Sequence, residues 1–220
     1  RAREARRGGH YGDALALLDR AGDEAGATAE FLHEKALNWH LRGEPERAIP
    51  LYEAAFAIAE TARIAFNLGS AFGDLGQMDH AVSWFERARQ SDPSWEDPVA
   101  ALASVLERQS RLEEGQALLQ PLIDRQSEKT NTVLTYARIA RRRGALNDAA
   151  GALERLTSGT AARQALSGIE REALYFELGS LYDAAGNYDA AFDAFRQANT
   201  ARMHHYDPRA HEASVETLIG

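Results

Sequence analysis

The chain of 220 residues contains no cysteine, only two lysines (Lys35 and Lys129) and no long apolar run. Without cysteine, a disulfide scaffold and a cysteine-rich zinc module are excluded. The longest uninterrupted apolar run, residues 54–59, has six residues, whereas a membrane-spanning helix needs about 20. The formal charge of -8 argues against a surface for nucleic acid or anionic membranes spread over the whole molecule. We therefore expect a soluble chain without a membrane span or a nucleic-acid partner. The absence of cysteine fits a reducing and an oxidising compartment equally, and a cytoplasmic location is our expectation.

What the chain does contain is an internal repeat. A small residue is followed by a large apolar residue four positions later and by a small or apolar residue three positions after that. The six copies are Ala14/Leu18/Ala21, Ala48/Tyr52/Ala55, Ala81/Phe85/Ala88, Gly115/Leu119/Leu122, Ala149/Leu153/Leu156 and Ala191/Phe195/Ala198, with spacings of 34, 33, 34, 34 and 42. Five positions before each copy stands a turn residue: Gly9, Gly43, Gly76, Ser110, Gly144 and Gly186. A period of this length predicts stacked helix pairs, and therefore an all-α fold.

The segment before each of these helices has a pattern of its own. In one copy it reads Ala65, Leu68, Gly69, Phe72, and in the last copy Tyr175, Leu178, Gly179, Tyr182. This pattern resembles the tetratricopeptide repeat signature, W-x2-L-G-x2-Y followed by A-x3-F, on a 34-residue period. The resemblance implies a right-handed superhelix of helix pairs, an α-α solenoid. The expected array covers residues 1–206, with a partial first repeat at 1–28 and full repeats near 29–61, 62–95, 96–129, 130–163 and 172–205.

The repeat is irregular at three places. The spacing of 42 predicts a longer loop or a helix extension around residues 157–171. At the start, residues 1–7 read as only the tail of a first helix, so we expect further repeats upstream. At the other end, Asp207 and Pro208 are a good N-cap and first-turn pair. They predict a capping or connecting helix within residues 207–220.

Motifs for catalysis, cofactors and metals are missing from the sequence. There is no G-x-S-x-G, no phosphate-binding G-x-x-x-x-G-K-[ST] and no H-E-x-x-H. His204, His205 and His211 are close in sequence but lack the spacing of metal ligands, so we interpret them as solvated helix-end residues. We predict no catalytic residue, no cofactor and no metal in these residues.

The resemblance instead places function on the concave face, which the first helix of each pair lines. The partner-binding residues that it implies are His33, His40, Arg63, Phe66, Asn67, Ser70, Ser104, Arg108, Asn131, Arg138, Arg141, Arg142, Phe176 and Ser180. We expect His33 and His40 to be surface histidines of this groove. Three arginines, at 138, 141 and 142, suit an acidic or phosphorylated partner. The alternative is that arginines at a helix end simply meet the negative end of the helix dipole.

The last 45 residues carry a second resemblance. Residues 178–183, 186–189 and 195–199, followed by Tyr206-Asp207, are similar to the end of the repeat region in a bacterial family in which a sulfotransferase domain follows the repeats. This implies a parent protein that uses a phosphoadenosine phosphosulfate donor, with the repeats docking the acceptor. Our first prediction is a scaffold that binds a protein or peptide. The alternatives are this docking role and an architectural role, in which open repeat ends self-associate.

Overall fold

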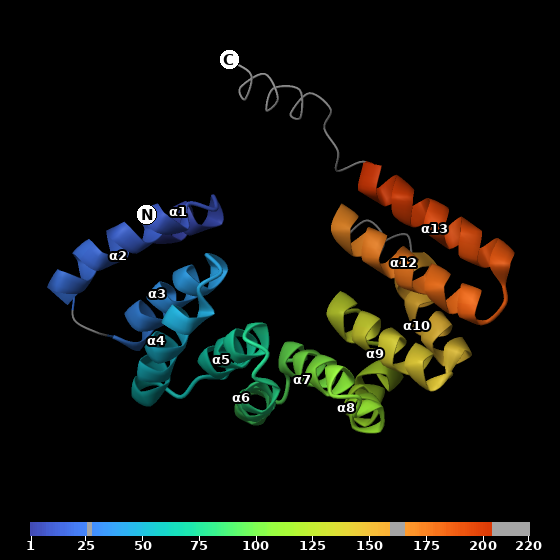
Figure 1. Cartoon of the computed structure of the whole chain (residues 1–220), viewed down its shortest axis with the longest axis horizontal. Coiled ribbons are helices and arrows are strands. Elements are labelled where there is room, and N and C mark those ends of the chain that lie inside the picture. Colours follow the sequence, from blue (N-terminus) through green and yellow to red (C-terminus); the bar gives the residue numbers. More distant parts are fainter. Residues whose placement is uncertain (26–27, 159–165, 204–220) are drawn as a thin grey trace, which may run out of the picture. The chain divides into compact units, whose positions relative to one another are not determined.

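The computed structural model describes residues 1–25, 28–158 and 166–203, which form twelve helices and no strand (Figure 1). The chain separates into two compact units, Arg1–Arg111 and Leu112–Gly220. The helices of the first unit are α1 (Ala2–Arg7), α2 (Tyr11–Ala25), α3 (Ala29–Leu41), α4 (Pro45–Ile58), α5 (Ala62–Asp74), α6 (Met78–Ser91) and α7 (Asp97–Arg108). Those of the second unit are α8 (Leu112–Asp124), α9 (Thr130–Arg143), α10 (Leu146–Ser158), α12 (Gly168–Ala184) and α13 (Tyr188–Met203). The predicted all-α, repeat-based fold class is confirmed.

The predicted turn residues all adopt a left-handed backbone conformation. The backbone φ angle is positive at all six of them: 77° at Gly9, 86° at Gly43, 72° at Gly76, 60° at Ser110, 78° at Gly144 and 75° at Gly186. Glycine adopts this left-handed conformation without steric cost, which is why it marks five of the six turns. Gln126, which follows α8, also has a positive φ of 57°. The residue type of Gln126 does not predict this left-handed conformation.

Small residues let the two helices of a pair approach closely. In the pair α3/α4, the side chains of Ala48, Tyr52 and Ala55 are fully buried. In the pair α5/α6, a Cβ atom added at Gly69 would lie 2.7 Å from Cδ1 of Phe85. The last pair repeats this contact, because a Cβ at Gly179 would lie 2.7 Å from Cδ1 of Phe195. Nearly all triad residues whose side chains the structure describes are buried between helices, as the sequence predicts.

Helix α12 begins at Gly168, four residues before the repeat start that we expected near residue 172. Its start is fixed by a capping box: the Ser167 hydroxyl accepts a hydrogen bond from the Glu170 amide at 3.2 Å, and Glu170 Oε2 accepts one from the Ser167 amide at 2.9 Å. Residues 168–171 are thus a helix extension and not a loop. Residues 159–165 and the helix predicted within 207–220 lie outside the described residues.

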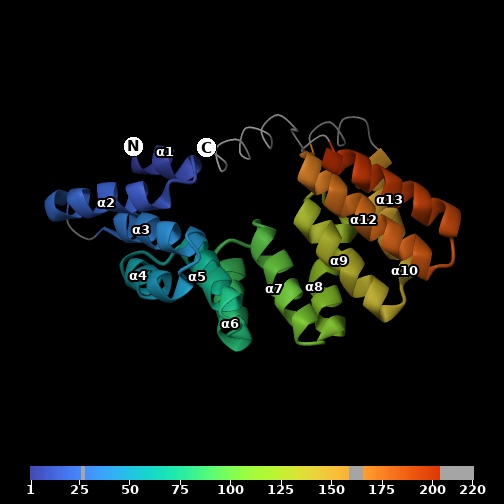
Figure 2. The same cartoon turned by 45° about the horizontal axis from the view of Figure 1, so that its top comes forward.

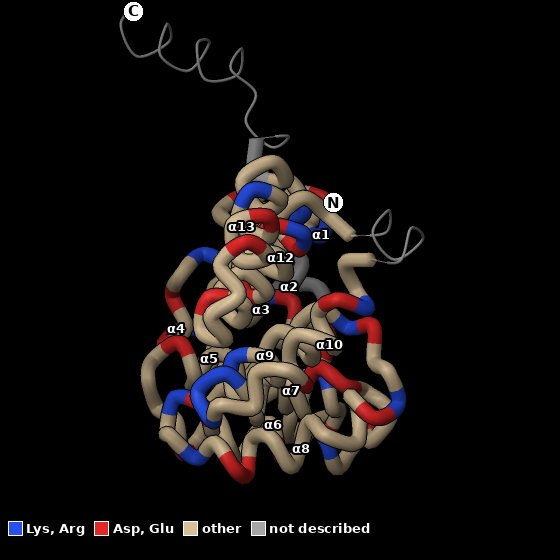
Figure 3. The backbone as a smooth tube through the Cα atoms, turned by 90° about the vertical axis from the view of Figure 1, so that its right-hand side faces the viewer, with Lys and Arg blue, Asp and Glu red and all other residues tan. Residues whose placement is uncertain are grey.

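Acidic and basic positions are interspersed along the helices of both units (Figure 3). Several of them pair between neighbouring helices, such as Lys35 of α3 with Asp19 of α2 at 2.7 Å. Among the described residues, no helix has the length and apolar character needed to cross a membrane.

Candidate functional site

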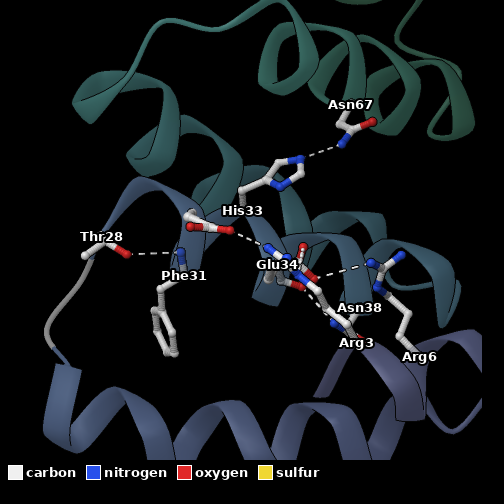
Figure 4. A network of polar contacts seen from close by, with 9 residues as sticks. Arg3, Arg6, Thr28, Phe31, His33, Glu34, Asn38 and Asn67 are labelled. Carbon is white, nitrogen blue, oxygen red and sulfur yellow. Dashed lines mark hydrogen bonds and ion pairs between the residues drawn. The ribbon is translucent and has the colours of Figure 1, made fainter. Parts of the chain in front are cut away.

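A buried histidine joins the first helices of two neighbouring pairs in the first unit. His33 of α3 and Asn67 of α5 are 34 residues apart, one repeat, and His33 Nε2 lies 2.8 Å from Asn67 Nδ2 (Figure 4). The amide therefore donates this hydrogen bond, and the imidazole accepts it. Burial lowers the pKa of His33, and the nearby Arg63 lowers it further, while Glu34 opposes the shift. His33 is only 9% exposed, so our expectation of a surface histidine is wrong at this position.

The same repeat spacing joins two further residues of α3 and α5. His40 Nε2 lies 2.8 Å from Asp74 Oδ2, and the His40 side chain is only 13% exposed. The rings of both histidines lie near the buried Tyr52 of α4, with centroid distances of 5.7 Å for His33 and 6.1 Å for His40. Both imidazoles thus lie near Tyr52 and have a polar partner on α5, which is the Asn67 amide for His33 and the Asp74 carboxylate for His40.

Helix α5 presents one stripe of candidate residues. Arg63, Phe66, Asn67 and Ser70 have the spacing i, i+3, i+4, i+7, which places them on one helix face. The Arg63 side chain is exposed and forms no ion pair with any described residue. Phe66 is half-buried, 4.9 Å from the Trp95 ring and 5.5 Å from the Phe85 ring. An unpaired guanidinium, an aromatic edge and an amide therefore lie side by side on this stripe.

Helix α7 borders this stripe. The exposed Arg108 makes a long contact of 3.5 Å from Nη1 to the Gly73 carbonyl oxygen of α5. Ser104, one turn earlier on α7, is half-buried, and Ser70 Oγ donates to the Phe66 carbonyl oxygen at 3.1 Å within α5. We call the surface formed by Arg63, Phe66, Asn67, Ser70 and Arg108 the α5–α7 face. Its polar groups suit hydrogen bonds to a peptide backbone and charge-assisted bonds to a carboxylate.

An ion-pair network that sequence reasoning missed borders α3 on the side of α1 (Figure 4). Arg3 Nε lies 3.0 Å from Glu34 Oε1, and Arg6 Nη2 lies 3.4 Å from Glu34 Oε2. Arg3 also pairs with Glu30. Glu30 and Glu34 are four residues apart and so share one side of α3; the sequence does not indicate that α1 packs on this side. The network neutralises much of the positive charge of α1.

In the second unit, the predicted arginine cluster of α9 makes contacts within the protein. Arg141 Nε lies 2.9 Å from Glu177 Oε1 of α12, and the Glu177 side chain is only 13% exposed. Arg138 Nη2 donates to Thr135 Oγ1 at 3.2 Å. Arg142 and Asn131 are exposed. Part of the positive charge of this cluster is therefore compensated by α12.

The two remaining candidates lie on α12. Phe176 is 55% exposed, and its ring centroid is 5.3 Å from that of Phe195. Ser180 Oγ donates to the Phe176 carbonyl oxygen at 2.9 Å, so the serine hydroxyl is used within the helix. Both residues belong to the second unit, as do Asn131 and the arginines of α9.

Within the described ranges, no group of three or more His, Asp or Glu side chains gathers in a way that would hold a metal ion. The hydrogen bonds described above for the candidate residues do not pair a serine hydroxyl with a histidine or a carboxylate that could act as its base.

Comparisons with known proteins agree with this architecture. Two models of the tetratricopeptide repeat match the chain, one over residues 42–94 and the other over residues 173–202. These ranges hold the helix pairs in which Gly69 meets Phe85 and Gly179 meets Phe195. No curated protein matches the chain in sequence.

Solved structures share the fold at low sequence identity. PilW, a widely conserved type IV pilus biogenesis factor, has a TM-score of 0.72 at 19% identity, over 100% of this chain and 95% of PilW. YrrB, a tetratricopeptide repeat protein with an unusual peptide-binding site, has a TM-score of 0.59 at 18% identity, over 86% of this chain and 93% of YrrB. MamA from Desulfovibrio magneticus RS-1, residues 41 to the end, has a TM-score of 0.64 at 13% identity, over 81% of this chain and 97% of that structure. The chain thus has the fold of a tetratricopeptide repeat solenoid.

Proposed function

We propose that this chain is an interaction scaffold that binds a protein segment in extended conformation on its α5–α7 face. The observation that carries the proposal is the helix face of α5 on which Arg63 lies beside Phe66 and Asn67. Arg63 is exposed and forms no ion pair with a described residue. The exposed Arg63 guanidinium is accessible to a ligand, and a carboxylate can form a charge-assisted, bidentate pair with it. YrrB, a protein with this fold, has a peptide-binding site, which supports a peptide as the class of partner.

The side chains of this face suggest what the peptide contains. Asn67 uses its Nδ2 to hold His33, which leaves its carbonyl oxygen to accept a bond from a peptide amide. Arg63 and Arg108 are both exposed and suit an acidic side chain or a terminal carboxylate. The exposed edge of Phe66 offers contact for an apolar side chain. We therefore propose a peptide that combines an acidic group with an apolar residue.

A selection from a random peptide display library tests this function. The wild-type chain is used for selection, and the double variant Arg63→Ala/Arg108→Ala is used for counter-screening. We expect the selected peptides to be enriched in Asp or Glu and to lose binding to the double variant. Peptides that bind both proteins equally would show that another surface is the binding site.

The arginine cluster of α9 supports a second, weaker proposal. Arg138, Arg141 and Arg142 would add an acidic or phosphorylated partner site on the second unit, in competition with Glu177 for Arg141. Replacement of all three by Ala should then weaken binding of an acidic peptide in a salt-dependent way. Equal affinity in the triple variant would remove this cluster from the account.

The remaining predictions concern the parent protein. The resemblance of residues 178–207 to bacterial repeat–sulfotransferase proteins supports an acceptor-docking role, which the reading frame beyond Gly220 tests directly. A phosphosulfate-binding loop within the next domain would favour this role, and its absence would refute it. Self-association through repeat ends is tested by the molar mass at increasing concentration. The cytoplasmic location and bacterial origin stay predictions.

A further inference from the structure

Helices α3 and α5 are neighbours in the first unit (Figure 2), and one contact between them depends on the proton of a histidine. His33 Nε2 lies 2.8 Å from Asn67 Nδ2. An amide nitrogen is a donor, so Nε2 carries no proton, and the neutral imidazole holds its proton on Nδ1. Figure 4 shows the Asn67 carbonyl oxygen on the side away from His33. The histidine therefore determines which end of the amide is left for a ligand.

Protonation of His33 reverses this arrangement. The imidazolium has a hydrogen on both ring nitrogens, so Nε2 becomes a donor. Two donors at 2.8 Å repel each other, and the Asn67 amide has to rotate so that its oxygen accepts the new hydrogen bond. The oxygen and the NH2 group of an amide are similar in size, so the rotation changes the hydrogen bond and not the packing. Asn67 then offers a donor to a ligand where it offered an acceptor before.

The charged groups that face His33 from α3 and α1 are paired with each other. Glu34 Oε1 lies 3.0 Å from Arg3 Nε, and Glu34 Oε2 lies 3.4 Å from Arg6 Nη2. The carboxylate favours a charged imidazole at His33, and the two arginines oppose it. Because the oxygens of Glu34 are engaged, Glu34 acts on His33 through its charge, and the Asn67 amide is the hydrogen-bond partner.

The groups that face His33 from α4 and α5 keep the ring neutral near pH 7. The Tyr52 ring of α4 lies 5.7 Å away, and burial raises the pKa of its phenol well above the usual value, so this neighbour is uncharged. Burial is also the main cause that lowers the pKa of His33, and the positive charge of Arg63 on α5 lowers it further. The change of state therefore lies below the ordinary histidine value of about 6.5.

We propose that His33 is a positioning residue of the α5–α7 face, which orients the Asn67 amide so that neutral His33 selects an N–H donor of the peptide and protonated His33 selects a C=O acceptor. This inference rests on the proposed peptide binding and adds the direction of one hydrogen bond and its control by pH. A peptide whose backbone N–H bonds to Asn67 Oδ1 meets a donor after protonation. Acid therefore weakens the binding of such a peptide through a histidine that is only 9% exposed.

NMR of the wild-type chain without a peptide observes the proton and the amide directly. The 15N shifts of the His33 imidazole distinguish the two neutral tautomers and the imidazolium, and the side-chain amide signals of Asn67 report its hydrogen bond. We expect an unprotonated Nε2 at about pH 7.5 and, on lowering the pH to about 5, changes at both residues with one midpoint. A proton on Nε2 at about pH 7.5, different midpoints, or a ring that stays neutral at about pH 5 would each overturn the proposal.

Fluorescence anisotropy with a peptide selected at about pH 7.5 measures the effect on binding. We expect the Kd to be at least about threefold weaker at about pH 5, because the fraction of protein in the binding-competent state falls. His33→Gln keeps hydrogen-bonding groups but cannot be protonated, so its Kd should not share this change. Asn67→Ala should bind more weakly at about pH 7.5, and its remaining pH dependence gives the contribution of the carboxylates of the peptide.

The matched control is His40→Gln. His40 is the other histidine of α3 beside Tyr52, but its Nε2 contacts Asp74 Oδ2 at 2.8 Å and not Asn67. This variant should keep the pH dependence of the wild type. Far-UV circular dichroism at both pH values shows whether each variant is folded, and the NMR experiment needs no variant.

The outcomes separate this inference from the peptide-binding proposal. The inference is overturned if the ratio of the Kd values at the two pH values is the same for the wild type and Asn67→Ala. A pH dependence that persists in His33→Gln, or that is lost in His40→Gln, would overturn it as well. Failure of the peptide-binding proposal would instead appear at about pH 7.5, as equal Kd values for the wild type and Arg63→Ala/Arg108→Ala.

Discussion

Replacing two glycines of the second unit by alanine should have opposite effects on stability. Both are in helices, Gly179 in α12 and Gly151 in α10. A Cβ at Gly179 would lie 2.7 Å from both Cδ1 and Cε1 of Phe195, whereas a Cβ at Gly151 would have no neighbour within 4 Å. The chemical change is the same, so the difference between the two variants reports the close approach of α12 and α13.

The expected magnitudes follow from two opposing contributions. Alanine in place of glycine favours a helix by about 1 kcal/mol, and this gain applies at both positions. Overpacking in a tightly packed contact costs about 1–3 kcal/mol, and this cost applies only at Gly179. We therefore expect Gly151→Ala to raise the free energy of unfolding by up to about 1 kcal/mol. Gly179→Ala should lower it by about 1 kcal/mol as the net of the two contributions.

Urea unfolding followed by circular dichroism measures both changes, with equal m-values required for the comparison. A rescue variant, Gly179→Ala/Phe195→Leu, removes the ring that the new methyl group meets. It should be more stable than the sum of its single changes predicts, because the two residues are in contact. If Gly179→Ala is as stabilising as Gly151→Ala, the helix register of this pair is wrong.

Three further outcomes follow from individual contacts. Ser167→Ala should lower the free energy of unfolding by about 1 kcal/mol in urea titrations through loss of the capping box, whereas the exposed Ser158→Ala should change it little. Glu177→Gln removes the ion pair with Arg141 and should cost up to about 1 kcal/mol at low salt and less at high salt; a loss that does not depend on salt would contradict the ion pair. Because burial holds the pKa of His33 below its usual value, the unfolded chain binds a proton near pH 6 that the folded chain does not, so stability should fall as the pH falls below about 6.5. His33→Gln should lose this part of the pH dependence of the melting temperature.

The repeat positions were predictable from sequence because each is subject to a local or strictly periodic constraint. Positive φ angles favour glycine, and the close contact of Gly69 with Phe85 excludes a larger side chain. These constraints show in the residue type itself. The same reasoning found Ser110 only through its spacing, and it missed Gln126, whose left-handed backbone follows from tertiary context.

The site was less predictable because its contacts join residues about one repeat apart. The resemblance to the tetratricopeptide repeat implied His33 and Asn67 as candidates, but not the burial of His33 against Tyr52 or the hydrogen bond that joins the two side chains. In the same way, Arg141 is read from sequence as a free cation, and only the packing of α9 on α12 brings Glu177 to it. Whether a polar side chain is available to a partner depends on the neighbouring repeat.

The central claim is that the α5–α7 face binds a peptide, and the affinity of one selected acidic peptide tests it most directly. Fluorescence anisotropy gives the Kd for the wild type, for Arg63→Ala/Arg108→Ala and for Arg47→Ala/Arg87→Ala. The last variant removes the same charge from α4 and α6, where Arg47 and Arg87 lie over Trp39 and Trp84. We predict at least a tenfold weaker Kd for the first variant, which is about 1.4 kcal/mol, and an unchanged Kd for the second. Equal Kd values for all three proteins would contradict the claim.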